Sequence, residues 1–153
     1  MLCLLLIWGC DKSKEEVQKA KDSVMAAHDD AMAKMEKMHE LQNKLKALIA
    51  QKTVAENADT PERSASLDAE VKIQEVNLDS AKIQQLILAL GDADKAMMDW
   101  MKQYEDPSED MSAEEQKKYF AEQQKLIDKV VEMTNSSIAN SEDLLKATES
   151  KPE

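Results

Sequence analysis

Apolar residues recur at alternating steps of three and four along three long stretches of the chain, a spacing that places them on one face of an α-helix. The first stretch covers about residues 13–51 without glycine or proline. Its face combines two rows with a seven-residue step: Val24, Ala31, Met38 and Leu45, and His28, Met35, Gln42 and Ile49. Polar and small residues follow, and Thr60 before Pro61 is suited to cap a second helix.

The second helix is expected over about residues 62–104 and the third over about residues 113–147. Gly91 falls inside the second, but the apolar phase is the same on both sides of it, so the helix should continue. Ser112 and Glu115 have the spacing of a capping box at the start of the third helix. The second helix has one row of Val76, Ile83, Leu90, Met97 and Tyr104 and a companion row of Ile73, Ser80, Ile87, Asp94 and Met101. The third helix has one row of Phe120, Ile127, Thr134 and Ser141 and a companion row of Gln124, Val131, Ile138 and Leu145.

Three long helices with short connections predict an all-α fold, an elongated antiparallel three-helix bundle that is up-down-up and coiled-coil-like. The bundle should cover residues 17–148 and leave residues 149–153 as a disordered tail. In this topology one end gathers the aromatic residues and two methionines: Trp100, Tyr104, Tyr119, Phe120, Met97 and Met101. The other end is aliphatic and contains Leu45, Ile49, Ile73 and Leu145.

Composition supports helix and argues against several functions. The 153 residues are 42% hydrophobic and 3% aromatic with two glycines, which favours helix over strand. The net charge of −11 repels phosphate backbones, so we expect no nucleic-acid partner. A glycine-rich phosphate loop cannot be built from one glycine beyond residue 10, and no Ser or Cys lies in a nucleophile motif. We therefore expect no enzyme and no catalytic residue.

The first ten residues, MLCLLLIWGC, form an apolar run that is too short to span a bilayer, which takes about 20 apolar residues. The run resembles the end of a bacterial lipoprotein signal peptide, because Ile7, Gly9 and Cys10 fit the lipobox. Residues 1–9 would then be the remnant of the signal, Cys10 the lipidated residue, and residues 10–16 a polar tether. The segment Lys14, Glu15 and Glu16 resembles the surface-export signal of Bacteroidota lipoproteins.

His28 lies in the middle of the first apolar face. A buried imidazole without a hydrogen-bond partner costs about 1–3 kcal/mol. Folding the second helix back along the first brings Asp94, a core-facing carboxylate, near the level of His28. The sequence therefore predicts a buried polar pair of His28 and Asp94.

The segment MAAHDDAMAKMEKMH, residues 25–39, contains four methionines and both histidines. Methionine at helical spacing is ordinary core filler, so we interpret the segment as packing, without a cofactor. The alternative is a copper site, because thioether and imidazole groups suit Cu(I). Its candidate ligands are His28, Met25, Met32, Met97 and Met101. Haem held by His28 and a methionine is a further alternative.

Two segments, AHDDAMAKMEKMHELQNKLK and LGDADKAMMDWMKQY, follow the signal in this order and precede a helical tail. With them, nearly the whole chain resembles a family of small helical Bacteroidota lipoproteins of unknown function, often labelled "viral A-type inclusion protein". The resemblance implies a cell-envelope lipoprotein and supplies no catalytic residues.

The expected function is a non-enzymatic interaction or structural module, with a copper-binding envelope protein as the alternative. The expected partners are the membrane, through the N-terminal lipid, and an unidentified envelope protein. The expected location is the cell envelope, lipid-anchored at the outer membrane, and the export signal leaves exposure at the cell surface open.

Overall fold

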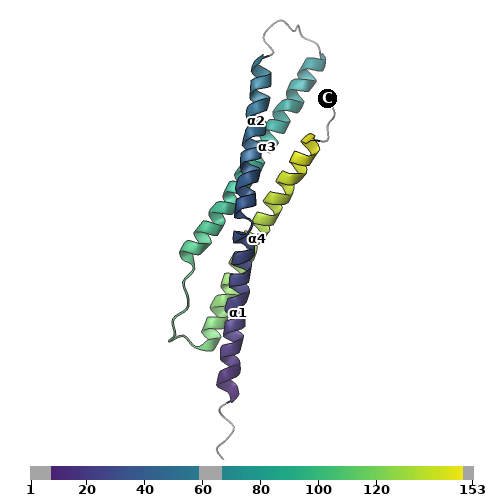
Figure 1. The fold of residues 1–153 in the computed structure, drawn as a ribbon. Helices are drawn as coiled ribbons and strands as arrows, with labels where there is room; N and C mark the ends of the chain where they lie inside the picture. Colours follow the sequence, from purple (N-terminus) through teal and green to yellow (C-terminus); the bar gives the residue numbers. More distant parts are fainter. Residues whose placement is uncertain (1–7, 59–66, 150–153) are drawn as a thin grey trace, which may run out of the picture. The chain divides into compact units, whose positions relative to one another are not determined.

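A computed structural model describes the backbone of residues 8–58 and 67–149, and the side chains of residues 12–51 and 80–149. In these ranges the chain forms four helices and no strand: α1 (Trp8–Met32), α2 (Met35–Ala58), α3 (Leu67–Gln103) and α4 (Ala113–Glu149) (Figure 1). The predicted all-α class is confirmed. Within the described part of the chain, no helix has an apolar stretch long enough to cross a membrane.

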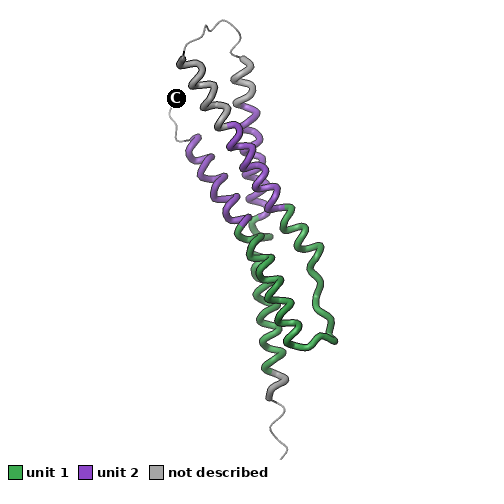
Figure 2. Tube along the Cα trace, turned by 180° about the vertical axis from the view of Figure 1, so that it is seen from behind, with its two compact units in different colours: residues 1–34, 95–132 green, residues 35–94, 133–153 purple. Residues whose placement is uncertain are grey.

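The helices form two compact units, which Figure 2 colours separately. Unit 1 consists of Met1–Lys34 and Lys95–Glu132, and unit 2 of Met35–Asp94 and Met133–Glu153. Three helical segments pack together in each unit. They are α1 with parts of α3 and α4 in unit 1, and α2 with the remaining parts of α3 and α4 in unit 2.

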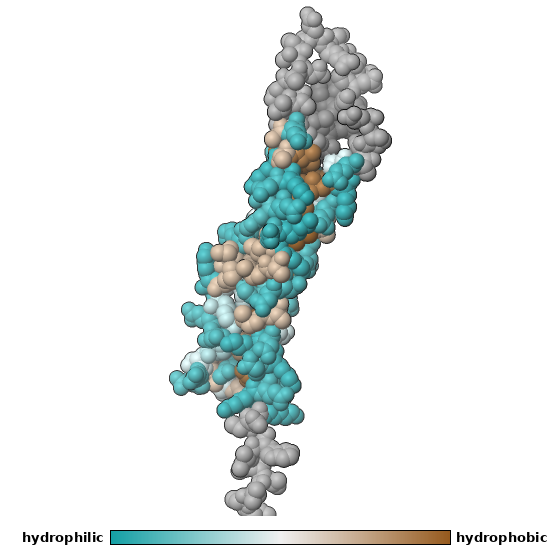
Figure 3. All heavy atoms as spheres, in the orientation of Figure 1, coloured by the Kyte–Doolittle hydropathy of each residue, from teal (hydrophilic) through white to brown (hydrophobic). Residues whose placement is uncertain are grey.

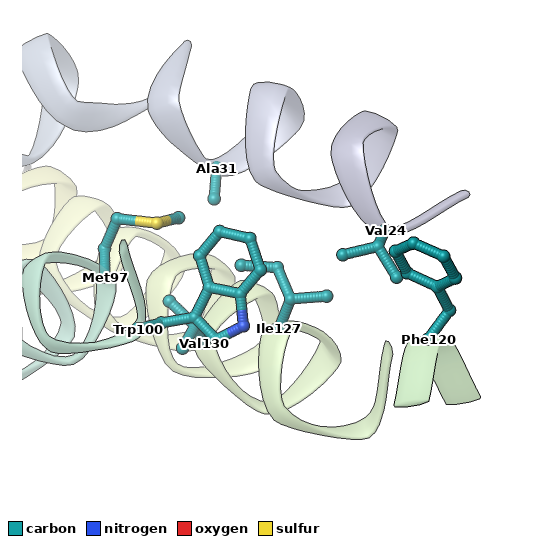
Figure 4. Close-up of a cluster of buried hydrophobic side chains, with 7 residues drawn as sticks. All are labelled: Val24, Ala31, Met97, Trp100, Phe120, Ile127 and Val130. Carbon is teal, nitrogen blue, oxygen red and sulfur yellow. The ribbon is translucent and has the colours of Figure 1, made fainter. Parts of the chain in front are cut away.

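The core of unit 1 combines small residues of α1 with large residues of α3 and α4 (Figure 4). Val24 lies beside Phe120, and the thioether of Met97 lies beside Ala31 and the ring of Trp100. We call this set the unit 1 cluster. Its buried members are Val24, Ala31, Met97, Trp100, Phe120, Ile127 and Val130.

The core of unit 2 is aliphatic. Its buried members are Met38, Leu41, Leu45, Ile83, Leu86, Leu90 and Ala93, and Ile49 and Leu145 pack against them. The predicted separation of aromatic and aliphatic residues is therefore confirmed for the described side chains, since the four aromatic residues Trp100, Tyr104, Tyr119 and Phe120 all belong to the unit 1 cluster or pack against it. The side chain of Ile73 lies outside the described residues.

The structure corrects the predicted continuous first helix, because α1 ends at Met32 and α2 begins at Met35. A row with a seven-residue step packs in the cores of the two units and contains Ala20, Ala27, Leu41 and Leu48. Lys34 occupies the middle position of this row. Burying an unpaired ammonium is costly, and Lys34 instead bonds to Asp30 at 2.6 Å. The backbone tightens there, since the Lys34 N–H donates to the carbonyl of Ala31, three residues earlier.

The end of α3 and the start and end of α4 agree closely with the prediction, whereas α1 begins at Trp8 and not about residue 13, α2 ends at Ala58 and not about residue 51, and α3 begins at Leu67 and not about residue 62. Gly91 lies inside an uninterrupted α3, as its surrounding pattern predicts. The capping box before α4 is confirmed, because the Ser112 N–H donates to the Glu115 carboxylate at 2.9 Å, and the Glu115 N–H donates to the Ser112 hydroxyl at 3.3 Å. The predicted cap at Thr60 and Pro61 and most of the predicted tail, residues 150–153, lie outside the described residues.

Each predicted helix face consists of two rows. One row points inward as expected, but the side chains of its companion row are less deeply buried. In α3, Leu90 and Met97 are buried as predicted. Beside them Ala93 and Trp100 are buried, whereas the predicted companions Asp94 and Met101 are only half-buried. In α4, Val130 and Ser137 are buried and the predicted Val131 and Ile138 are half-buried. The inward companion thus lies three residues after the first row, not four.

Candidate functional site

A continuous series of ring contacts runs through unit 1. The imidazole of His28 lies 5.5 Å from the ring of Trp100, which lies 5.0 Å from the ring of Tyr104, measured between centroids. Tyr104 is 6.3 Å from Tyr119, and Tyr119 is 5.5 Å from Phe120. Contacts at these distances stabilise a cluster beyond the area that they bury. Helix α1 thereby brings His28 to one edge of an aromatic core supplied by α3 and α4.

A polar network is attached to Tyr104, in the middle of this aromatic series. Lys21 of α1 bonds to the carboxylate of Asp106 at 2.8 Å, and the Tyr104 hydroxyl donates to the same carboxylate at 2.9 Å. These two donors lower the pKa of Asp106 below its ordinary value. Burial of the phenol and its bond to Asp106 raise the pKa of Tyr104. The sequence gives no periodic signal for this network, because Asp106 lies in the segment between α3 and α4.

The segment between α3 and α4 is also held by Tyr119. Its hydroxyl donates to the backbone carbonyl of Glu105 and accepts a hydrogen bond from the Glu105 N–H at 3.3 Å. At the start of α1, Glu16 bonds to Lys117 of α4 at 3.1 Å. Unit 1 is therefore held by polar contacts among α1, α4 and the connecting segment, as well as by its aromatic core.

His28 is held beside Trp100 by its neighbour in sequence. The His28 Nδ1 lies 3.0 Å from the Asp29 carboxylate, and the His28 side chain is 18% exposed. Because a carboxylate accepts, the proton of a neutral His28 lies on Nδ1 in this contact. Nε2 makes no hydrogen bond to any residue that the structure describes. His28 therefore has one constrained nitrogen and one free nitrogen.

The partner predicted for His28 has a different neighbour. Asp94 lies 3.6 Å from the Nε2 of His39, within unit 2, and its side chain is 38% exposed. His28 has its contact with Asp29, within unit 1. The predicted buried pair of His28 and Asp94 is thus replaced by one contact between sequence neighbours and one contact between α2 and α3, because the companion row of α3 that contains Asp94 does not turn inward. Each carboxylate remains partly in water, which lowers the cost of charge burial.

The structure divides the four predicted methionine ligands into two groups. Met97 is buried and Met101 packs against the unit 1 cluster, so both contribute to the core. Met25 is half-buried, Met32 is 38% exposed, and neither belongs to that cluster or to the residues packed against it. Interpretation as core packing therefore accounts for Met97 and Met101 but not for Met25 and Met32.

The predicted anchor and export residues lie at the start of α1. Cys10 falls within the backbone range of α1, but its side chain lies outside the described residues, as do residues 1–7 of the predicted signal over residues 1–9. Lys14 is exposed. Glu15 bonds to Lys19 at 2.8 Å, which lowers the pKa of Glu15, and Glu16 bonds to Lys117. The two acidic residues of the predicted export signal thus also form ordinary helix-surface ion pairs.

Unit 2 has a polar feature that the sequence pattern underestimates. Thr134 and Ser141 are fully buried, and their hydroxyl groups have no hydrogen-bond partner among the described residues. A groove of about 410 Å³ lies elsewhere in this unit, and its charged side chains are Lys82 and Asp143. The groove is lined by Lys82, Gln85, Leu86, Asn140, Asp143, Leu144 and Ala147, a mixed set without a cluster of reactive groups.

No three His, Cys, Asp or Glu side chains gather as a metal site among the side chains that the structure describes. Methionine thioethers are the other soft ligands that this chain offers. A comparison with family models, curated proteins and solved structures found no match to the chain.

Proposed function

We propose that the chain is a non-enzymatic helical interaction or structural module that a lipid on Cys10 holds at the cell envelope. The observation that carries this proposal is the path of α1. The helix begins at Trp8, and Val17 already packs against the unit 1 cluster. Seven residues of helix span about 10 Å, so a lipid on Cys10 would hold unit 1 close to a membrane surface.

The distribution of charge supports a solvated module that presents helix surfaces. Ion pairs between residues four apart follow the outer faces, as in Glu40 with Lys44 at 2.6 Å and Asp30 with Lys34. The face seen in Figure 3 is mainly hydrophilic, with hydrophobic side chains visible between the charged ones. Such pairs contribute little stability each but keep helices soluble. A net charge of −11 favours partners with a basic surface.

The same proposal includes the antiparallel, up-down-up course and the coiled-coil-like packing. Contacts within each unit support the antiparallel course. Residues with higher numbers on one helix contact residues with lower numbers on the neighbouring helix. In unit 1, Lys21 meets Asp106 and His28 meets Trp100. In unit 2, the Gln42 amide donates to the carbonyl of Ile87 at 3.2 Å, and His39 meets Asp94.

The resemblance to small Bacteroidota lipoproteins supports the envelope location. It supports the proposal of a lipid anchor at the outer membrane, of export to the surface through Lys14, Glu15 and Glu16, and of an envelope protein as partner. It carries no activity.

Partitioning between detergent and water tests the anchor. The full chain should enter the detergent phase and incorporate radioactive palmitate, and Cys10→Ala should abolish both. Cys3→Ala is the matched control, because it removes the other cysteine and leaves Cys10 in place. If the Cys10→Ala protein still enters the detergent phase and is still labelled, the proposed lipoprotein anchor is wrong.

A further inference from the structure

We propose that Met25, His28 and Met32 form a copper(I) site on α1 of unit 1. The three residues are separated by steps of three and four, which places them on one face of the helix. His28 lies in the middle of the three, one turn from each methionine. Thioether sulfur and imidazole nitrogen together are a donor set that suits Cu(I).

The two methionines are available because neither belongs to the packed core of unit 1. Met25 and Met32 lie outside the unit 1 cluster and reach solvent, whereas Met97 is fully buried within it. Figure 4 shows the Met97 thioether beside Ala31 and the ring of Trp100. A metal ion can approach the outer pair without opening the core. The proposed ligand set therefore omits Met97, and it omits Met101, which packs against the same cluster.

His28 is prepared for binding through Nε2. The Asp29 carboxylate accepts from Nδ1 and so keeps the proton away from Nε2, the arrangement in which a second residue orients a metal-binding imidazole. Nε2 has no competing hydrogen bond among the described residues. The ring is also supported on one side by Trp100 at 5.5 Å. Asp29 and Trp100 therefore both restrain the imidazole before a metal binds.

The surroundings favour a soft cation. Aromatic faces attract nearby cations, and the ring of Trp100 lies beside the imidazole of His28. The negative charge of the chain raises the local concentration of cations of any kind. Selectivity comes from the donors, because Zn²⁺ prefers thiolate, imidazole and carboxylate ligands, and two of the three donors here are neutral thioethers.

A competition titration tests the site. The full chain carrying Cys3→Ala and Cys10→Ala, which removes both thiols that would compete for Cu(I), is titrated with Cu(I) in detergent micelles in the presence of bicinchoninate, without oxygen. We expect one tightly bound Cu(I) per chain, and an affinity that falls by about tenfold or more in His28→Gln and in the double variant Met25→Leu and Met32→Leu. His39→Gln and Met98→Leu are the matched controls, since they change another histidine and another exposed methionine. Their affinity should equal that of the unchanged protein.

The double methionine variant keeps the test independent of His28 packing. Leucine replaces methionine at similar volume and costs less than about 1.5 kcal/mol, and Trp100 keeps its contact with His28. Circular dichroism melts of each variant check the fold. Emission from Trp100 in a Trp8→Phe background should be quenched by Cu(I) in the controls and not in the double variant.

Three results would overturn the proposal: absence of competition with bicinchoninate, an unchanged affinity in either ligand variant, or an equal loss in the controls. Titration with Zn²⁺ should leave the Trp100 emission unchanged. Displacement of Cu(I) by an equal concentration of Zn²⁺ would contradict the thioether ligands.

Discussion

Gly91 lies inside α3, where helix propensity alone disfavours glycine. Replacing it with alanine should stabilise a helix interior by about 1 kcal/mol, because alanine has less backbone freedom to lose. The φ of Gly91 is not positive, so alanine can adopt the same backbone conformation without strain. A side chain at this position would point toward Gln42 of α2, since an added Cβ would lie 3.4 Å from the Gln42 Nε2.

The contact with Gln42 determines the net effect. The Gln42 amide donates to the Ile87 carbonyl at 3.2 Å, and a hydrogen bond of this kind contributes about 0.5–1.5 kcal/mol. A Cβ at 3.4 Å is ordinary van der Waals contact with the end of a flexible side chain, so the hydrogen bond should survive. We therefore expect Gly91→Ala to stabilise the protein by about 0.5–1 kcal/mol, a rise in Tm of about 1–4 °C.

Thermal and urea unfolding followed by circular dichroism measures the effect. Ala81→Gly is the matched control, because Ala81 lies on the exposed side of the same helix and should lose about 1 kcal/mol on replacement. The double variant Gln42→Ala and Gly91→Ala separates the effect of helix propensity at residue 91 from the effect of its contact with Gln42. If Gly91→Ala lowers stability by more than about 0.5 kcal/mol both with and without Gln42, the propensity argument is refuted.

Three further predictions follow from buried or paired side chains. Trp100 is 6% exposed, so its emission in a Trp8→Phe background should be blue-shifted and resistant to soluble quencher, and emission like that of free tryptophan would contradict the cluster. Thr134→Val removes a buried hydroxyl without a partner and should raise unfolding free energy by about 1 kcal/mol; a decrease would mean that the hydroxyl has a partner. A double-mutant cycle of Lys21→Met and Asp106→Asn should give a coupling of about 0.2–1 kcal/mol near neutral pH. Because the folded pKa of Asp106 is lowered, this coupling should be lost as the pH falls below its ordinary pKa and through the lowered value, and coupling that persists in strong acid would contradict the ion pair.

Much of the local structure could be predicted from the sequence because it depends on neighbours along the chain. Ser112 and Glu115 satisfy each other's backbone N–H within one turn, so their spacing was sufficient to locate the start of α4. The uninterrupted α3 around Gly91 follows from the unchanged apolar phase on both sides. The break after Met32 was not predicted, because it depends on whether Lys34 faces the core.

The candidate copper site was predictable only in part. The spacing of Met25, His28 and Met32 is visible in the sequence, and it defines one helix face. Spacing could not separate these methionines from Met97, because that separation depends on which side of α1 packs against α3. The contact of Asp29 with the Nδ1 of His28 also had no distinguishing signal among the many acidic residues.

The sequence by itself determined the all-helical class and one inward row in each helical stretch. Rows such as Val24 and Ala31, or Leu90 and Met97, must turn inward whatever the arrangement of the helices, because no other solution buries these apolar side chains. Tertiary structure decided the companion row. Positions three and four residues after a row lie on opposite sides of it, and only the placement of the neighbouring helix selects between them. That selection buries Trp100 rather than Met101, and it leaves Asp94 at the surface beside His39 instead of in a buried pair with His28.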